Sequence, residues 1–457
     1  MKLIAKLLDV KEELVELYQN NFDLLRQGSS EIINRFRDEA IEQFRKKGIP
    51  NRKNEEYKYT VLEPHFQKDY KYHFKPKKIT FAIDDIFKCD VPELETKNLL
   101  LLNGWFLSEK EQLQEFKNGV ILGSLAEAAK KYPVLVEKYY GKHAKTSIDN
   151  LVALNTAYAQ DGIFIYVPKG VVLDFDIQII NILLDDENLM VQPRNLFIME
   201  ENSEARLIIC DHSLSEREFL TNSVTEIVAN ANARLDIVKM QNEHNLTTQL
   251  SSTFISQKRN SNVSTNIISL HGGMIRNNIH VVLEEEGCES STYGLYLVDK
   301  KQHVSNHAIV EHISSNCTSK QKFKGVIDDK ASGAFNGKIL VHPNAQKTNA
   351  FQTNNNILLT DDAEMNTKPQ LEIYADDVKC SHGATVGQLD DDAMFYLRAR
   401  GIGEREARLM LMYAFTFEII NEIKVLPLRD RINELVDKRL RGELSRCNNC
   451  AMNCQKD

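Results

Sequence analysis

The turn Asn230-Ala231-Asn232-Ala233 lies between two runs of strand-like sequence, and similar turns recur around it at intervals of 26 to 30 residues. Almost no helical period interrupts the runs, and from residue 330 onward the turns come at roughly half that interval. A repeat of this length built from strands alone is typical of a solenoid, in which each coil stacks its apolar face on the next. The alternative is a β-sandwich or barrel of meandering hairpins. The related turns are Asn202-Ser203-Glu204-Ala205, Asn260-Ser261-Asn262-Val263 and Glu286-Gly287-Cys288-Glu289.

This mainly β core covers residues 151–388, and residues 1–150 before it are predicted to form a mixed, mainly helical domain. Two helices are expected in the first fifty residues, because Ala40 and Phe44 continue a helical spacing that Gly48 and Pro50 end. Further along, the pattern predicts strands at 98–106 and 119–122 and short helices at 124–132 and 148–160.

Helical spacing returns after the core, over residues 389–442. Asp390 to Asp392 can cap a short helix that runs to Arg400, and Pro427 opens a last helix with Ile432, Leu435, Val436 and Leu440 on one face. The sequence after them, residues 443–457, is a polar tail that we expect to be disordered. Between the two helices we expect a longer one over 404–423, with an apolar face made of Ala407, Met410, Leu411, Ala414, Phe415 and Ile419.

The composition argues against several classes of protein. The chain has 57 basic and 65 acidic residues, a net charge of −8, which does not suit general nucleic-acid binding. No stretch approaches the roughly 18 apolar residues that a membrane span needs, and Met1 to Leu17 lacks the apolar core of a signal peptide. We therefore expect a cytoplasmic protein whose eight cysteines are mostly reduced. Four of them are expected to be small core residues: Cys89, Cys210, Cys288 and Cys317.

Motifs of the common enzyme classes are missing from the sequence. It contains no phosphate-binding loop of the type that ends in Gly-Lys-Ser/Thr. The Gly401-Ile402-Gly403 segment lacks a third glycine and follows a helix, so it breaks that helix rather than binding a dinucleotide. Thr385 stands where a nucleophile elbow would have Ser. We expect no catalytic activity.

Cys380 and His382 are the candidate metal ligands of the core. They lie two residues apart, so in an extended backbone both side chains point to the same face. A thiolate and an imidazole suit iron–sulfur clusters, zinc or Cu(I). Two ligands do not complete a tetrahedral site, so such a site would take further ligands from another chain. The competing interpretation makes Cys380 a core residue and His382 a surface residue.

Three more cysteines lie close together in the tail, as Cys447-x-x-Cys450-x-x-x-Cys454. Three thiolates within eight residues could hold a metal ion if a fourth ligand came from elsewhere. The competing interpretation is a flexible tail whose thiols are prone to oxidation.

Seven segments carry a resemblance to a known family: Asn54 to Thr60, Leu154 to Gly162, His342 to Thr348, Leu358 to Asp361, Thr367 to Ile373, Asp376 to Thr385 and Phe395 to Ile402. They resemble the SufB/SufD family, and within it SufD, a subunit of the SufB–SufC–SufD iron–sulfur cluster assembly complex. The resemblance covers nearly the whole chain. The paralogue SufB carries Glu-His-Glu where this chain has Ser381-His382-Gly383, and a cysteine where it has Leu397.

The resemblance implies a right-handed parallel β-helix between N-terminal and C-terminal helical regions. It implies that the ATPase SufC docks on the C-terminal helices and that the β-helix pairs with SufB. It also implies that His382, with Cys380 beside it, meets iron or a transient iron–sulfur cluster at the SufB interface. A reduced flavin is expected of the assembled complex, and no sequence feature locates it in this chain.

Three functions remain open from the sequence. The first is a non-catalytic scaffold subunit for cluster assembly. The second is a β-helix carbohydrate enzyme that uses acidic pairs such as Asp361-Asp362 or Asp376-Asp377. The third is a homodimer formed through an exposed sheet edge when the usual partner is absent.

Overall fold

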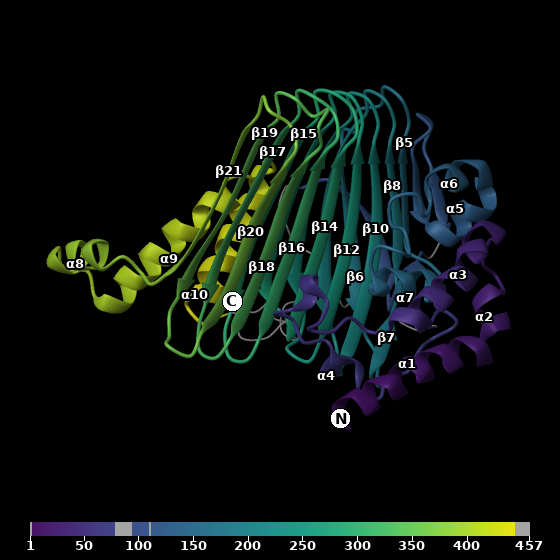
Figure 1. Cartoon of the computed structure of the whole chain (residues 1–457), viewed down its shortest axis with the longest axis horizontal. Helices are drawn as coiled ribbons and strands as arrows, with labels where there is room; N and C mark the ends of the chain where they lie inside the picture. Colours follow the sequence, from purple (N-terminus) through teal and green to yellow (C-terminus); the bar gives the residue numbers. More distant parts are fainter. Residues whose placement is uncertain (1, 78–93, 109–110, 444–457) are drawn as a thin grey trace.

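The computed structural model describes residues 2–77, 94–108 and 111–443, and its centre is a parallel β-solenoid (Figure 1). From β8 (Arg194–Met199) to β21 (Lys379–Gly387) the even-numbered strands join one sheet and the odd-numbered strands join the other. Each strand pairs in parallel with the strand two places along the chain, as β12 (Thr248–Gln257) does with β14 (Met274–Leu283). The predicted solenoid is confirmed, and the hairpin sandwich is wrong.

Within the described residues, the two sheets have ten and eleven strands. In spatial order the ten-stranded sheet contains β2 (Trp105–Leu107), β1 (Thr96–Leu102), β6 (Asp176–Leu183), β9 (Glu204–Ser213), β11 (Arg234–Asn242), β13 (Asn262–His271), β15 (Glu289–Val298), β17 (Thr318–Ile327), β19 (Asn349–Leu358) and β21. The eleven-stranded sheet contains β20 (Glu364–Ile373), β18 (Ser332–Val341), β16 (His303–His312), β14, β12, β10 (Phe219–Ala229), β8, β5 (Ile163–Val167), β4 (Ile121–Ser124) and β3 (Leu113–Glu115), with β7 (Leu189–Val191) beside β10.

The recurring turns form a ridge along which the chain crosses from the eleven-stranded to the ten-stranded sheet. Asn202, Asn232, Asn260 and Asn316 all have positive φ, from 55° to 60°, a conformation that Asn adopts more readily than most residues. Gly287 takes the same place in another coil, with φ of 73°. Along this ridge, from β8 to β19, the sequence repeat is therefore the repeat of one left-handed turn residue per coil.

The shorter interval between the later turns has a topological cause. Lys330 lies between β17 and β18, whereas Asn344 lies between β18 and β19. The later turns thus alternate between this ridge and the opposite one, so that two turns fall in each coil.

The N-terminal helices cover the outer face of the eleven-stranded sheet at its first coils (Figure 1). Residues 2–50 contain three helices rather than the expected two, and the third, α3 (Glu31–Lys47), is followed by its C-cap residue Gly48 with φ of 69°. The short helices expected at 124–132 and 148–160 are present as α5 (Leu125–Lys131) and α7 (Asn150–Tyr158). The helices of this region are α1 (Lys2–Asn20), α2 (Phe22–Arg26), α3 (Glu31–Lys47), α4 (Glu63–Phe66), α5 (Leu125–Lys131), α6 (Pro133–Tyr139) and α7 (Asn150–Tyr158).

Residues 1–150 also extend both sheets of the solenoid. β1 pairs in parallel with β6, and β4 pairs with β5. The expected strand at 98–106 is in fact two strands, β1 and β2, joined by Asn103-Gly104, both with positive φ. An Asn-Gly pair favours this kind of tight hairpin.

The C-terminal helices lie at the other end of the molecule, as predicted (Figure 1). They are α8 (Asp391–Ala399), which Asp390 caps, α9 (Glu404–Ile420) and α10 (Leu426–Leu440). α9 and α10 pack on the outer face of the ten-stranded sheet, where Leu409 and Ile432 join Ile208 and Leu295 in one apolar cluster. Within the ranges that the structure describes, no helix is long and apolar enough to cross a membrane.

The predicted apolar face of α9 is partly wrong. Ala407 and Ile419 are buried, but Met410 is 44% exposed and Ala414 faces solvent. Apolar residues occur around most of this helix, so helical spacing alone fits more than one stripe. Packing against the sheet selects the stripe that contains Ala407, Leu409, Met412, Thr416, Ile419 and Ile420.

Candidate metal and partner site at the open end of the solenoid

The solenoid ends in a coil that nothing in the described chain covers. β20 and β21 are the last strands of their sheets, so each has one edge to which no described segment adds a strand. Most residues of β21 are exposed, and none of β20 is fully buried. An unpaired edge presents backbone N–H and C=O groups that another chain can bind.

Cys380 and His382 lie on the inward side of this last coil. In the ladder they pair with Ala350 and Gln352, two residues that are buried inside the solenoid. The structure therefore places both side chains on one face, as predicted, and that face is the uncovered end of the core.

The two candidate ligands differ in environment. Cys380 packs against Ala350 and Val341 and is half-buried, and this burial raises the pKa of its thiol. His382 is exposed. The competing interpretation made Cys380 a core residue and His382 a surface residue. These environments fit it, since Cys380 contacts the core and His382 reaches solvent. Whether they bind a metal ion stays a prediction.

The core behind these residues is polar rather than purely aliphatic. The amide of Gln352 donates to Gln321 one coil further in. The hydroxyl of Tyr296 donates to Asn356 at 2.5 Å and accepts from Asn354 at 2.9 Å. These bonds fix the last complete coil, so the terminal strand lies on a rigid support.

Exposed apolar side chains surround the open end. Tyr374, in the turn before β21, is 63% exposed, and Phe351 and Val386 are also exposed. Helix α8 projects away from the solenoid (Figure 1) and has no buried residue. Its Phe395 is 75% exposed, and Tyr396 is exposed beside it. Clustered exposed apolar residues are typical of protein-interaction sites.

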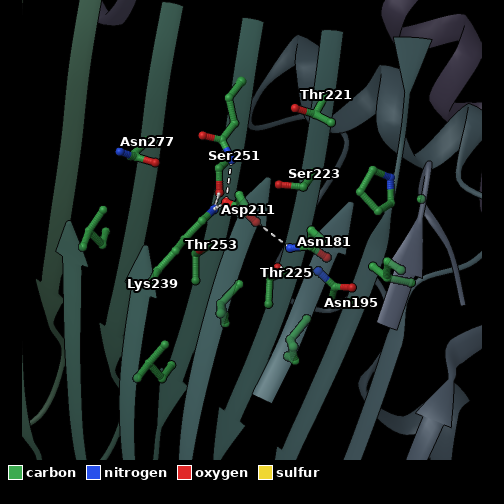
Figure 2. A pocket seen from close by; sticks show the side chains of 18 of the residues that line it. Asn181, Asn195, Asp211, Thr221, Ser223, Thr225, Lys239, Ser251, Thr253 and Asn277 are labelled. Carbon is green, nitrogen blue, oxygen red and sulfur yellow. Dashed lines mark hydrogen bonds and ion pairs between the residues drawn. The ribbon is translucent and has the colours of Figure 1, made fainter. Parts of the chain in front are cut away.

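A second polar site lies deep inside the solenoid, far from β21 in the order of strands (Figure 2). A cavity of about 70 Å³ is lined by Asp211 and Lys239. Lys239 donates to Ser251 at 2.8 Å and lies 3.5 Å from Asp211, which also accepts from Asn181 at 2.5 Å. No motif of the sequence indicated this cluster, although Asp211 and Lys239 occupy inward positions of strands β9 and β11.

Glu243 lies beside this cavity and is 2% exposed. Burial, followed by the nearby Asp211 carboxylate, raises its pKa to about 8. Glu243 is therefore protonated at neutral pH, and Asp211 and Lys239 compensate each other. The cavity is an internally neutralised polar core rather than a charged ligand site.

One group of three possible metal ligands lies close together elsewhere in the described residues. His73, Asp185 and Glu187 have ligand atoms within 4.8 Å of one another. Lys77 already pairs with Asp185 at 2.8 Å, so an ammonium group occupies this position.

The remaining cysteines and the two acidic pairs are buried, exposed or outside the described residues. Cys210, Cys288 and Cys317 are buried, as expected. Cys89 and the tail residues Cys447, Cys450 and Cys454 lie outside the described residues. Asp361-Asp362 and Asp376-Asp377 are exposed and lie in separate turns, on either side of β20.

The architecture defines a class of β-solenoid subunit with helical flanks and an uncovered last coil, and the comparisons identify the family. The chain belongs to the SufBD family of the SUF iron–sulfur cluster assembly system. The family model "SUF system FeS cluster assembly, SufBD core domain" matches residues 182–415, and "SufBD protein N-terminal region" matches residues 8–179. This confirms the family that the motifs indicated.

Individual relatives agree with this assignment. The iron–sulfur cluster assembly protein SufD of Escherichia coli is 35% identical over 53% of this chain and 58% of its own length. SufD of Bacillus subtilis is 25% identical over 72% of this chain and 76% of its own length. A SufBD family protein of Synechocystis is 28% identical over 91% of this chain and 90% of its own length.

Proposed function

We propose that this protein is a non-catalytic scaffold subunit of the SUF machinery, which pairs through the open end of its solenoid with SufB. The observation that carries the proposal is the uncovered last coil, with Cys380 and His382 on its inward side. A partner with a matching coil would continue both sheets and cover the exposed apolar residues around them. A homodimer through the same edge is the expected state when SufB is absent.

Iron or a nascent iron–sulfur cluster is the cargo proposed for this interface. His382 and Cys380 would supply two ligands, and SufB would supply the others. Because burial raises the pKa of Cys380, its thiol is protonated at neutral pH, and ligation displaces that proton. Iron loading should therefore improve as the pH rises. We assign the reduced flavin expected of the assembled complex to no residue of this chain.

The C-terminal helices are the proposed docking site of the ATPase SufC. Two features support this assignment: α8 projects without a buried residue, and α9 is held against the solenoid by Lys322 and Lys324, which pair with Glu418 at 2.6 and 2.9 Å. Movement of α9 would thus act on β17, two coil layers from the open end.

The decisive experiment is anaerobic iron–sulfur reconstitution of the chain co-expressed with SufB and SufC. His382→Ala is compared with wild type and with His342→Ala, a matched control whose histidine is also partly exposed but pairs with Glu311 at 3.5 Å. We expect all three complexes to assemble and only His382→Ala to lose iron. Equal iron in all three, or failure of the His382→Ala complex alone to assemble, would contradict the role of His382 as a ligand.

A further inference from the structure

Two buried cysteines occupy the same position in consecutive coils. Cys288 directly precedes β15 and Cys317 directly precedes β17, and the ladder pairs the next residues, Glu289 and Thr318. The backbone N–H of Thr318 donates to the carbonyl oxygen of Cys288 at 2.9 Å. Neighbouring strands are about 5 Å apart, which lies within the Cα separation that a disulfide needs.

Both sulfur atoms contact the same backbone carbonyl oxygen. Cys288 Sγ lies 3.0 Å from the carbonyl oxygen of Glu285, and Cys317 Sγ lies 3.2 Å from the same oxygen. Both residues are 0% exposed and both are free thiols. The solenoid has thus placed a pair of reduced thiols side by side inside its ridge.

The contact between the two thiols moves their pKa values in opposite directions. The S–H of Cys288 lowers the pKa of Cys317 more than burial raises it, and the backbone N–H groups of Cys288 and Gly287 lower it further. The same contact, together with burial, raises the pKa of Cys288. Of the two thiols, Cys317 therefore has the lower pKa and loses its proton more readily.

We propose that Cys288 and Cys317 form a reversible disulfide when a small two-electron oxidant of the peroxide class reaches the ridge. The Cys317 thiolate attacks one peroxide oxygen, and with one proton this yields a sulfenic acid and one water. The thiol of Cys288 then attacks that sulfur, which forms the S–S bond and releases the second water. Two thiols lose two electrons, and the peroxide is reduced to water.

The bond would connect two coils that also carry α9. Cys288 and Cys317 directly precede β15 and β17, and β17 holds α9 through Lys322 and Lys324. Oxidation would covalently join the support of the C-terminal helices. This inference does not depend on the proposed cargo or on the partners.

The test uses the full-length protein and peptide mapping. Reduced protein is treated with hydrogen peroxide, its remaining thiols are alkylated under denaturing conditions, and it is cleaved with trypsin. Cleavage after Arg276, Lys300, Lys301 and Lys320 isolates the two cysteines in peptides 277–300 and 302–320. We expect the linked pair of peptides, 2 Da lighter than their sum, and its loss after a second reduction.

Cys288→Ser and Cys317→Ser should each abolish the linked species, whereas Cys210→Ser, a buried cysteine on β9, should leave it unchanged. If both peptides of oxidised wild type are still recovered alkylated, the proposal is wrong. Because this result comes from wild type, it holds even if a variant fails to fold. A linked species that survives in Cys288→Ser would also overturn the assignment.

Discussion

A buried ion pair between Arg194 and Glu226 offers the sharpest test of how the N-terminal region is attached to the solenoid. Arg194 Nη2 lies 2.6 Å from Glu226 Oε2, and the two side chains are 1% and 0% exposed. Glu226 also accepts backbone N–H bonds from Gly141, His143 and Ala144 at 2.8 to 3.1 Å. One carboxylate of β10 therefore holds the segment that connects α6 to α7.

Glu226→Gln keeps the shape of this side chain and removes its charge. Arg194 would then be an uncompensated buried cation, and breaking a buried pair in this way costs about 3–5 kcal/mol. Since about 1.4 kcal/mol corresponds to a factor of ten, hydrogen-exchange protection of the amides at 141, 143 and 144 should fall by roughly two to four orders of magnitude.

The assay is amide hydrogen exchange with mass-spectrometric detection at pH 7. Burial alone would raise the pKa of Glu226, but Arg194 and the backbone N–H groups outweigh it, so the pKa is lowered overall. The stabilising contribution of Glu226 is therefore complete above the ordinary Glu pKa of about 4.3 and is lost only as the pH falls through the lower folded value. Measurements at pH 7 thus compare a fully ionised pair with a broken one.

The double variant Arg194→Met with Glu226→Gln supplies the control. It removes both charges, and we expect it to recover part of the protection that the single variant loses. Unchanged protection in Glu226→Gln would refute the reasoning, because the pair would then contribute nothing to attachment. If the double variant lost more protection than the Glu226→Gln and Arg194→Met single variants lose together, the role of the uncompensated charge would be refuted.

Three further predictions concern other parts of the molecule. Met412→Ala should destabilise the protein by about 2–5 kcal/mol, whereas Met410→Ala two residues earlier should change stability by less than about 0.5 kcal/mol. Chemical denaturation of both variants checks which face of α9 is buried. Equal losses of unfolding free energy in the two variants would contradict the corrected face. Burial lowers the pKa of His312 to about 4. As the pH falls, this histidine is therefore protonated near pH 6.5 in the unfolded chain but only near pH 4 in the folded chain. Stability should fall over that window, and His312→Gln should flatten the dependence of thermal unfolding on pH between 7 and 5; an unaltered slope would count against it. Phe395→Ala should leave thermal unfolding unchanged and weaken co-purification of SufC, and retention of full binding would exclude α8 from that interface.

The solenoid was predictable because the chain reverses direction through the same kind of turn in successive coils. Asn202, Asn232 and Asn260 repeat since each occupies the same left-handed position in a coil, and a repeat in the sequence is the direct record of that geometry. The placement of Cys380 and His382 on one face of a strand was likewise predictable, because side chains two apart share a face of any strand. That this face points inward came only from the structure.

Other features depended on packing that no local pattern records. The apolar stripe of α9 was misassigned because the helix has apolar residues around most of its circumference, and only the sheet beneath it selects a face. The polar cluster of Asp211 and Lys239 was missed because it forms across coils. The pairing of Cys288 with Cys317 was within reach of the sequence, since their separation of 29 residues falls inside the interval of 26 to 30 between turns.

Because the coil of β20 and β21 is uncovered, part of the folding free energy of this chain depends on which molecules in the surrounding solution bind to that coil. A solenoid whose last coil has no neighbour frays from that end, because this coil has one stacking interface where inner coils have two. Any molecule that binds the folded end stabilises it by mass action, by about 2.7 kcal/mol at a free concentration of 100 times its Kd. The melting temperature of the isolated chain should therefore rise with its own concentration, and its lifetime in a cell should depend on how much partner is present.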